Sequence, residues 1–371
     1  MTTKKPWRRA LAITTSIIGV ATITAGVAGF AAYRMGLGPF APPQADMAID
    51  AATRAATIQG AIDQIEQHYV FPDQAAALGK HLREQAKRGD FDSITSAETL
   101  ARTLSDSLRK DSGDGHLSVR YFEEAIAELP PGEEQTPAEK AEEAYNQKRL
   151  NYGFATVSRL SLNIGYIDIH AFGRPQQAQA KIAAAMTLMK DTHALIIDLR
   201  DCRGGDPETV MLLANYFFDR PTHLNDIYWR DESRTESRWT QPVAEGLGYG
   251  TARKVYILIG KETFSAGEDF AYALKSSGRA TIVGAPTEGG GAHPCAPRRI
   301  NSHFMIFVPT GRAINAVTHT NWQKTGVQPD LLVAEKKALD AAQVEIAKEV
   351  MASDPDPRIK RTAKQQISKL N

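Results

Sequence analysis

The stretch Lys261–Phe270, KETFSAGEDF, places a serine where a strand gives way to a helix. The apolar run VYILIG before it predicts a buried strand, and AYALKSSGRA after it predicts a helix. Ser265 therefore stands at a helix N-terminus, where free N–H groups and the positive dipole end suit a developing oxyanion. Serine is also a preferred N-cap residue, so this segment alone allows either a nucleophile or a cap.

Two other segments could complete a site for acyl transfer. In DLRDCRGGD (Asp198–Asp206), Gly204 and Gly205 let the backbone turn tightly after a buried strand, so that an N–H can point at a substrate oxygen. The alternative is an ordinary strand-to-helix turn. In GDGHLSV, His116 could act as a general base if the fold brings it to Ser265, and otherwise it is a structural or exposed histidine.

Glycine-rich loops, TEGGGAHP (287–294) and VPTGRAINAVTHTNWQKTGVQPD (308–330), are of the kind that line clefts. The histidines are scattered without metal-ligand spacing, so we expect neither a metal nor a cofactor. The formal net charge is +1, and no Lys/Arg cluster is interleaved with aromatic residues. Nucleic-acid binding is therefore not expected.

The N-terminus predicts export. Four basic residues precede an uncharged run from Ala10 to Tyr33, which is long enough as a helix to span a bilayer. The positive charges place the N-terminus in the cytoplasm and the rest of the chain outside. Residues 1–35 are interpreted as a signal anchor or a cleaved signal peptide. The body is expected in the cell envelope, membrane-anchored on the periplasmic or extracellular side, or secreted if the signal is cleaved.

The rest of the chain alternates between helical and strand patterns. Continuous apolar strands that alternate with helices predict a layered α/β domain with a largely parallel sheet, behind a small helical domain. The connector between the two is too short to hold a PDZ-like domain. The predicted parts are a linker (36–50), a helical N-terminal domain (51–120), a connector (121–150), an α/β core (151–335) and a helical C-terminal tail (336–371).

Several segments, read in order, resemble the tail-specific (C-terminal-processing) serine peptidase family. They are HYVFPDQAAA, DGHLSV, NYGF, NIGYIDI, LIIDLRDCRGG, TFSAGEDFAYALKSSGRATIVGAPTEGGGAHP and FVPTGRAINAVTHTNWQKTGVQPD. The likeness is strongest to the branch with bacterial homologues of interphotoreceptor retinoid-binding protein, related to the tricorn core protease. The resemblance covers about residues 55–335. It implies a crotonase/ClpP-like layered core with a helical N-terminal subdomain, and hydrolysis of peptides or unfolded proteins through an acyl-enzyme.

The resemblance also implies roles for single residues. Ser265 falls on the nucleophile of the family, and His116 falls on the histidine that serves as base in the tricorn-like branch. Ala266, together with Gly204 or Gly205, falls on the backbone donors of the oxyanion hole. Bacterial processing peptidases instead carry a lysine base in TFGKG. Here TEGGG places Gly290 at that position, so His116 is the only matching base.

A second departure lies in the late motif, where relatives read NWEGTGV and this chain reads NWQKTGV. Gln323 therefore takes the place of the acidic residue that orients the histidine. We expect its amide oxygen to accept the imidazole N–H, with help from the charge of Asp114. His293 is expected to line the same cleft without a catalytic role. Cys202 and Cys295 could form a disulfide if their loops meet.

The family resemblance leaves two functions open. The first is a serine peptidase. The alternative is a non-catalytic scaffold that binds hydrophobic ligands, like the retinoid-binding relatives. A meeting of Ser265 and His116 beside a formed oxyanion hole favours the enzyme. The oligomeric state is not predicted by the sequence.

Overall fold

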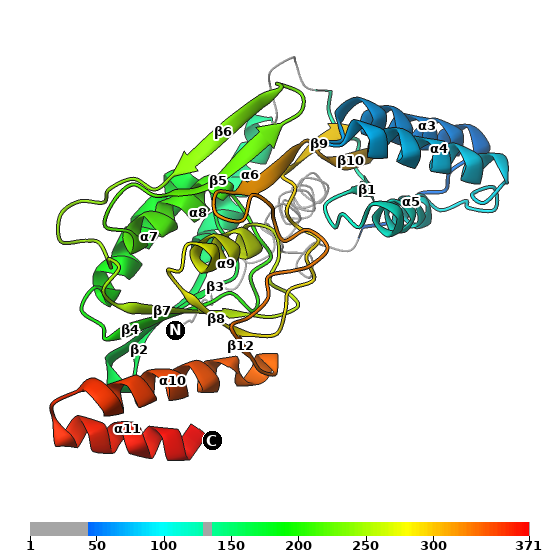
Figure 1. The fold of residues 1–371 in the computed structure, drawn as a ribbon. Helices are drawn as coiled ribbons and strands as arrows, with labels where there is room; N and C mark the ends of the chain where they lie inside the picture. Colours follow the sequence, from blue (N-terminus) through cyan, green and yellow to red (C-terminus); the bar gives the residue numbers. More distant parts are fainter. Residues whose placement is uncertain (1–43, 129–135, 371) are drawn as a thin grey trace, which may run out of the picture.

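The computed structural model describes residues 44–128 and 136–370 (Figure 1). The chain has a mixed α/β fold with a helical N-terminal region, as the sequence predicts. The predicted N-terminal membrane or signal helix lies outside the described residues. Among the described helices, none has the length and apolar character needed to cross a membrane.

A six-stranded sheet forms the centre of the larger part, in the order β12-β8-β7-β4-β3-β2. Neighbouring strands run parallel except at the β2 edge, where β2 and β3 are antiparallel. The strands are β2 (Phe154–Leu160), β3 (Ile164–Ile169), β4 (Ala194–Asp198), β7 (Lys254–Ile259), β8 (Thr281–Gly284) and β12 (Leu331–Leu332).

Helices cover both faces of this sheet, because alternate side chains of a strand point to opposite faces. Ile197 belongs to the core shared with one helical layer, whereas Ile196 belongs to the core on the other side. The first layer comprises α7 (Pro175–Met189), α8 (Pro207–Ala214) and α9 (Ala266–Ser276), and α10 (Ala338–Ser353) covers the opposite face. α11 (Pro357–Leu370) packs on α10. The C-terminal helices therefore complete the core.

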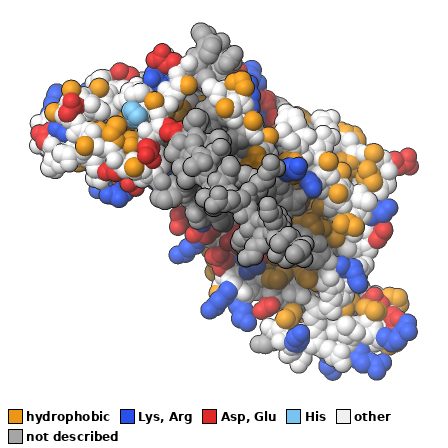
Figure 2. Space-filling model, turned by 180° about the vertical axis from the view of Figure 1, so that it is seen from behind, with side chains coloured by type: hydrophobic (Ala, Val, Ile, Leu, Met, Phe, Trp, Pro, Cys, Tyr) orange, Lys and Arg blue, Asp and Glu red, His pale blue; other side chains and the backbone are white. Residues whose placement is uncertain are grey.

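Lys and Arg side chains gather at the end of the molecule formed by α10 and α11, seen from behind in Figure 2. On α11 they include Arg358, Lys360, Arg361 and Lys364. This end lies far from the N-terminal helices (Figure 1).

Three helices form the N-terminal region: α3 (Ala51–His68), α4 (Pro72–Lys87) and α5 (Ala97–Ser112). The Ser96 side chain caps α5 by accepting a hydrogen bond from the Thr99 N–H. α5 ends at Gly113, whose φ of 68° is the left-handed conformation that glycine adopts easily. The chain consequently turns at once into Asp114-Gly115-His116.

Two small sheets complete the fold, and the sequence did not predict either pairing. β10 (Phe304–Pro309) lies between β1 (Ser118–Tyr121) and β9 (Cys295–Arg299), so its side chains join the core of the N-terminal helices. The other sheet has the order β11-β5-β6. Its strands are β5 (His223–Trp229), β6 (Arg234–Trp239) and β11 (Gly311–Asn315). The connector carries α6 (Pro137–Arg149).

Candidate active site

Ser265 and His116 meet although 149 positions separate them in the chain, with His116 Nε2 3.0 Å from Ser265 Oγ. Ser265 lies directly before α9 and has φ 53° and ψ −115°, a conformation that is costly for a residue with a Cβ. The ring of Phe264 packs against the imidazole, with centroids 4.9 Å apart. The hydroxyl at this helix N-terminus therefore faces a histidine.

Hydrogen bonds tie the turn before α9 to the turn after β4. The Thr263 hydroxyl accepts from the Gly260 N–H at 3.0 Å and donates to the Leu199 carbonyl at 2.8 Å. The Phe264 N–H donates to the Cys202 carbonyl at 2.9 Å. β4 and β7 are parallel neighbours, so both turns leave the same edge of the sheet. This pairing brings the DLRDCRGGD and TFSAGE segments together.

The glycine pair of the first segment lies against the serine. A Cβ placed on Gly204 would lie 2.8 Å from the Ser265 Cβ, and the φ values of Gly204 and Gly205 are 106° and 135°. Only glycine accommodates this close approach at such angles. Ala266 is the first residue of α9, so helix geometry leaves its N–H without an intrahelical acceptor. The start of α9 and the glycine pair therefore lie on the same serine, and the Gly204 N–H interacts with the Cys202 thiol.

The glycine-rich loop closes the other side of the serine. A Cβ on Gly291 would lie 2.5 Å from the Ser265 backbone nitrogen, so no larger residue fits there without rearrangement. Gly290 accepts a hydrogen bond from the Gly115 N–H at 2.9 Å, which connects this loop to the histidine turn. The position that holds a lysine in the Ser–Lys relatives is therefore a backbone contact here.

His116 is buried, and its surroundings keep the ring neutral. Burial lowers the pKa of His116 to about 4, although the nearby Asp114 carboxylate acts in the opposite direction. Asp114 accepts from the backbone N–H of His116 at 3.1 Å. Its other oxygen lies 2.5 Å from His293 Nδ1. Among the described residues, no group hydrogen-bonds His116 Nδ1. Asp114 therefore holds the backbone of His116 and a second histidine, and influences the imidazole only through its charge.

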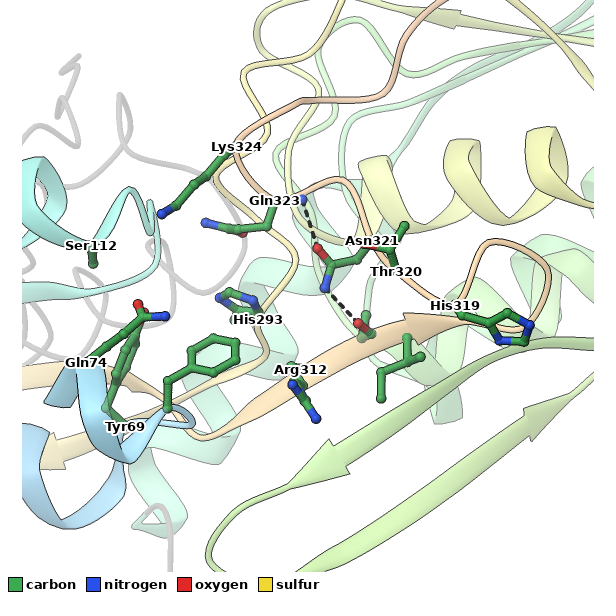
Figure 3. A pocket seen from close by; sticks show the side chains of 13 residues that line it. Tyr69, Gln74, Ser112, His293, Arg312, His319, Thr320, Asn321, Gln323 and Lys324 are labelled. Carbon is green, nitrogen blue, oxygen red and sulfur yellow. Dashed lines mark hydrogen bonds between the residues drawn. The ribbon is translucent and has the colours of Figure 1, made fainter.

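Gln323 requires a correction, because its amide has partners other than the imidazole of His116. The Gln323 Oε1 accepts from the Ala292 N–H at 3.1 Å, and its Nε2 donates to the Gly113 carbonyl at 2.7 Å. Its backbone N–H donates to Asn321 (Figure 3). Gln323 thus links the turn after α5 to the glycine-rich loop. It positions the site through the backbone of both segments.

Glu268 is the site residue that our sequence analysis missed. Its carboxylate is fully buried and accepts from the Ser265 N–H at 3.0 Å, the Thr287 hydroxyl at 2.5 Å and the Gly289 N–H at 3.1 Å. Burial raises the pKa of Glu268 to about 7, while these hydrogen bonds act in the opposite direction. Serine followed three residues later by glutamate is the capping-box spacing, which could have revealed it.

Neither cysteine is in a disulfide. Cys202 is buried against Gly267, and burial raises the pKa of its thiol to about 12. A disulfide with Cys295 is therefore absent from the structure. Among residues 44–128 and 136–370, no group of three or more His, Cys, Asp and Glu side chains could hold a metal ion.

Comparisons with known proteins show which family the chain is similar to. Residues 163–333 match the model of peptidase family S41, and residues 49–157 match the N-terminal domain of peptidase S41 in eukaryotic IRBP. The chain is similar to carboxyl-terminal-processing peptidase 2 of Arabidopsis thaliana, with 28% identity over 46% of this chain and 32% of the relative. It is also similar to the carboxyl-terminal-processing protease of Synechocystis, with 28% identity over 48% of this chain and 40% of the relative.

This chain therefore spans well under half the length of these curated relatives. Among solved structures, a protein of Parabacteroides merdae shares the fold, with a TM-score of 0.54 and 15% identity over 79% of this chain and 96% of that chain. The two family matches follow each other along the chain, and one contains Ser265 while the other contains His116. The chain belongs to peptidase family S41, a family of serine peptidases.

Proposed function

We propose that this chain is an exported serine peptidase that hydrolyses peptide bonds of peptides or unfolded proteins, on a ClpP-like core. Ser265 is the nucleophile, and His116 is the general base. The observation that carries the proposal is the 3.0 Å contact between His116 Nε2 and Ser265 Oγ at the start of α9. A nucleophile within hydrogen-bond reach of a neutral base is the arrangement that acyl transfer needs.

In the first half of the reaction, Ser265 Oγ attacks the carbonyl carbon as its proton passes to His116 Nε2. The negative charge that forms on the carbonyl oxygen is stabilised by the N–H groups of Ala266 and of Gly204 or Gly205. The imidazolium then protonates the leaving amine, and the C–N bond breaks. In the second half, His116 takes a proton from the water that attacks the acyl carbon. The bond between that carbon and Ser265 Oγ then breaks, the acid is released, and the imidazolium returns its proton to Ser265 Oγ.

The surroundings of His116 favour the neutral ring over the imidazolium that the first proton transfer forms. A ring with a pKa of about 4 is neutral at physiological pH and can accept the serine proton. The imidazolium that forms is stabilised by the charge of Asp114, which acts from the backbone side of the turn. We therefore expect a slower enzyme than one whose base is paired with a carboxylate.

The alternative of an apolar-ligand scaffold finds less support. The cavity of about 310 Å³ beside the histidine turn is lined mainly by polar and cationic side chains. Such a lining does not suit a hydrophobic ligand.

The experiment is fluorophosphonate labelling of the full chain, beside the Ser265→Ala and His116→Ala variants. We expect labelling of the wild type, none in Ser265→Ala, and a decrease of about 100-fold or more in His116→Ala. Export is tested with a membrane-impermeant probe on intact cells, which should label the same serine. Folded wild-type protein that does not react with the probe would refute the peptidase, and labelling only after lysis would refute export.

A further inference from the structure

A buried carboxylate beside the general base is shared by two histidines. Asp114 is fully buried, and its Oδ1 accepts a hydrogen bond from the backbone N–H of His116 at 3.1 Å. Its Oδ2 lies 2.5 Å from His293 Nδ1. An ionised carboxylate only accepts hydrogen bonds, so Nδ1 of His293 carries a proton and donates it to this contact. His293 is therefore a side-chain donor to a charge that lies next to the base.

Burial makes this donor important. A buried carboxylate keeps its charge only where donors or cations compensate the loss of water. The Tyr69 hydroxyl also points at Asp114 Oδ2, but from 3.4 Å, which is long for an O–H···O hydrogen bond. Among the described residues, loss of the His293 donor would thus leave this oxygen without a hydrogen bond of ordinary length.

The ring of His293 is held in place from two directions. The carbonyl of the next residue, Pro294, accepts a hydrogen bond from the Thr310 N–H at 3.0 Å. The Phe71 ring packs edge-on against the imidazole, with centroids 5.2 Å apart and an angle of 71° between the planes. The side chain is buried and lines the cavity of about 310 Å³, where Figure 3 shows it below Gln323. The backbone and the aromatic contact therefore direct Nδ1 at Asp114.

Asp114 matters to the reaction because no carboxylate contacts the imidazole of the base. Gln323 takes the place where the family resemblance implies an acidic residue, and its amide bonds backbone groups instead. His116 Nδ1 is buried without a hydrogen-bond partner among the described residues. Asp114 raises the pKa of His116 by more than His293 lowers it, so the pair as a whole favours the imidazolium. This help depends on the carboxylate staying charged and in place.

We propose that His293 is a positioning residue of the reaction, whose Nδ1–H holds the charged carboxylate of Asp114 beside the His116 imidazole. The Asp114–His293 pair then supplies the stabilisation that an acidic residue at position 323 would give. This inference rests on the proposed function and deepens it, because it names a further residue on which the chemical step depends. Since His293 acts through Asp114, its loss should slow the chemical step and leave binding of a probe unchanged.

The kinetics of fluorophosphonate labelling of the full chain test this role, with the maximal rate constant kinact separated from the half-saturating probe concentration KI. Leucine and asparagine have about the same shape, but only asparagine places an N–H close to the position of Nδ1. We expect His293→Leu to lower kinact about tenfold without a change in KI. His293→Asn should recover most of this loss.

A histidine–carboxylate pair away from the site provides the matched control. His223 on β5 contacts Asp226 at 2.8 Å. His223→Leu therefore removes a similar contact, and it should keep the wild-type kinact and KI.

A double-mutant cycle shows whether His293 acts through Asp114. In the Asp114→Asn background, which lacks the charge, His293→Leu should change kinact by less than about twofold. If His293→Leu does not fold, His293→Gln takes its place, because its amide keeps a polar group but places the nitrogen one bond beyond Nδ1. The order of kinact is then His293→Asn above His293→Gln.

Three results would overturn the role of His293: additive losses in the cycle, equal kinact in the Asn variant and in the Leu or Gln variant, or a loss confined to KI. A wild type that labels normally while one of these results is found refutes this role alone. A folded wild type that never labels refutes the peptidase and, with it, the role of His293.

Discussion

Replacement of Glu268 by glutamine isolates the buried carboxyl group that anchors the nucleophile. The side chain keeps its size, but one oxygen becomes an NH₂ group. Glu268 accepts from Ser265 and Gly289 backbone N–H groups through different oxygens. Whichever way the amide is placed, it leaves one of these donors facing another donor.

The structure sets the magnitude of this effect. A buried donor left without an acceptor costs about 1–3 kcal/mol, so the free energy of unfolding should fall by about that amount at pH 5. If the amide nitrogen faces Ser265, the residue loses the hydrogen bond that holds its strained backbone. The rate of fluorophosphonate labelling should then fall about tenfold or more, since misplacement of reacting groups is costly.

The effect on stability should depend on pH in a definite direction. The pKa of Glu268 is about 7 in the fold and about 4.5 in the unfolded chain, so the native state binds more protons between these values. The wild type therefore loses stability as pH rises from 4.5 to 7, because it must ionise a buried carboxyl group. Glutamine does not titrate. The stability difference between wild type and variant should thus be larger at pH 5 than at pH 8.

Urea unfolding at pH 5 and pH 8, with labelling rates at both, measures these effects. Glu345→Gln on α10 is the matched control, because Glu345 forms an exposed pair with Lys348 and should change stability by under about 1 kcal/mol. If the difference in free energy of unfolding between wild type and Glu268→Gln grows with pH, the fold stabilises the ionised carboxylate of Glu268, contrary to our reasoning. If Glu268→Gln is as stable and as reactive as the wild type at pH 5, the anchoring role is refuted.

Two further predictions concern His116 and Gly204. Burial lowers the pKa of His116 to about 4. As the pH falls, the labelling rate of Ser265 in the wild type and in Glu268→Gln should therefore drop to half of its plateau near pH 4. A drop to half near pH 6.5 would mean that the histidine is solvated. Gly204→Ala should lower the free energy of unfolding by more than Gly246→Ala, and should abolish labelling. Both residues have a positive φ, which costs alanine about 1–2 kcal/mol. At Gly204 the new Cβ would also lie 2.8 Å from the Ser265 Cβ, whereas at Gly246 no atom lies within 4 Å of it. Equal losses in urea unfolding would contradict the close approach.

Much of the layered core could be predicted from the sequence because its signals are local. The apolar runs that become β3, β4, β7 and β8 are buried on both faces, and strands of this kind read as continuous hydrophobic segments. The polar C-terminal helices were harder to place. α10 turns an apolar stripe that includes Ala342 and Ile346 toward the sheet, whereas α11 is rich in Lys and Arg.

The small sheets escaped prediction because strand pairing is a long-range property. The run FMIFVP looks like any other buried strand, and nothing in its own residues states that it pairs with Ser118–Tyr121. The hairpin of β5 and β6 carries charged side chains along an exposed edge, so the alternation of apolar and polar residues that predicts a strand was weak there.

Within the candidate site, residue types made Ser265, His116 and the glycine pair candidates, and the family resemblance implied their roles. Only the tertiary structure decided who contacts whom. In the structure, the Gln323 amide hydrogen-bonds the backbones of Gly113 and Ala292, and Asp114 contacts His293. These contacts depend on where loops from distant segments meet at one edge of the sheet, and hydrogen-bonding side chains take whichever partner burial leaves within about 3 Å.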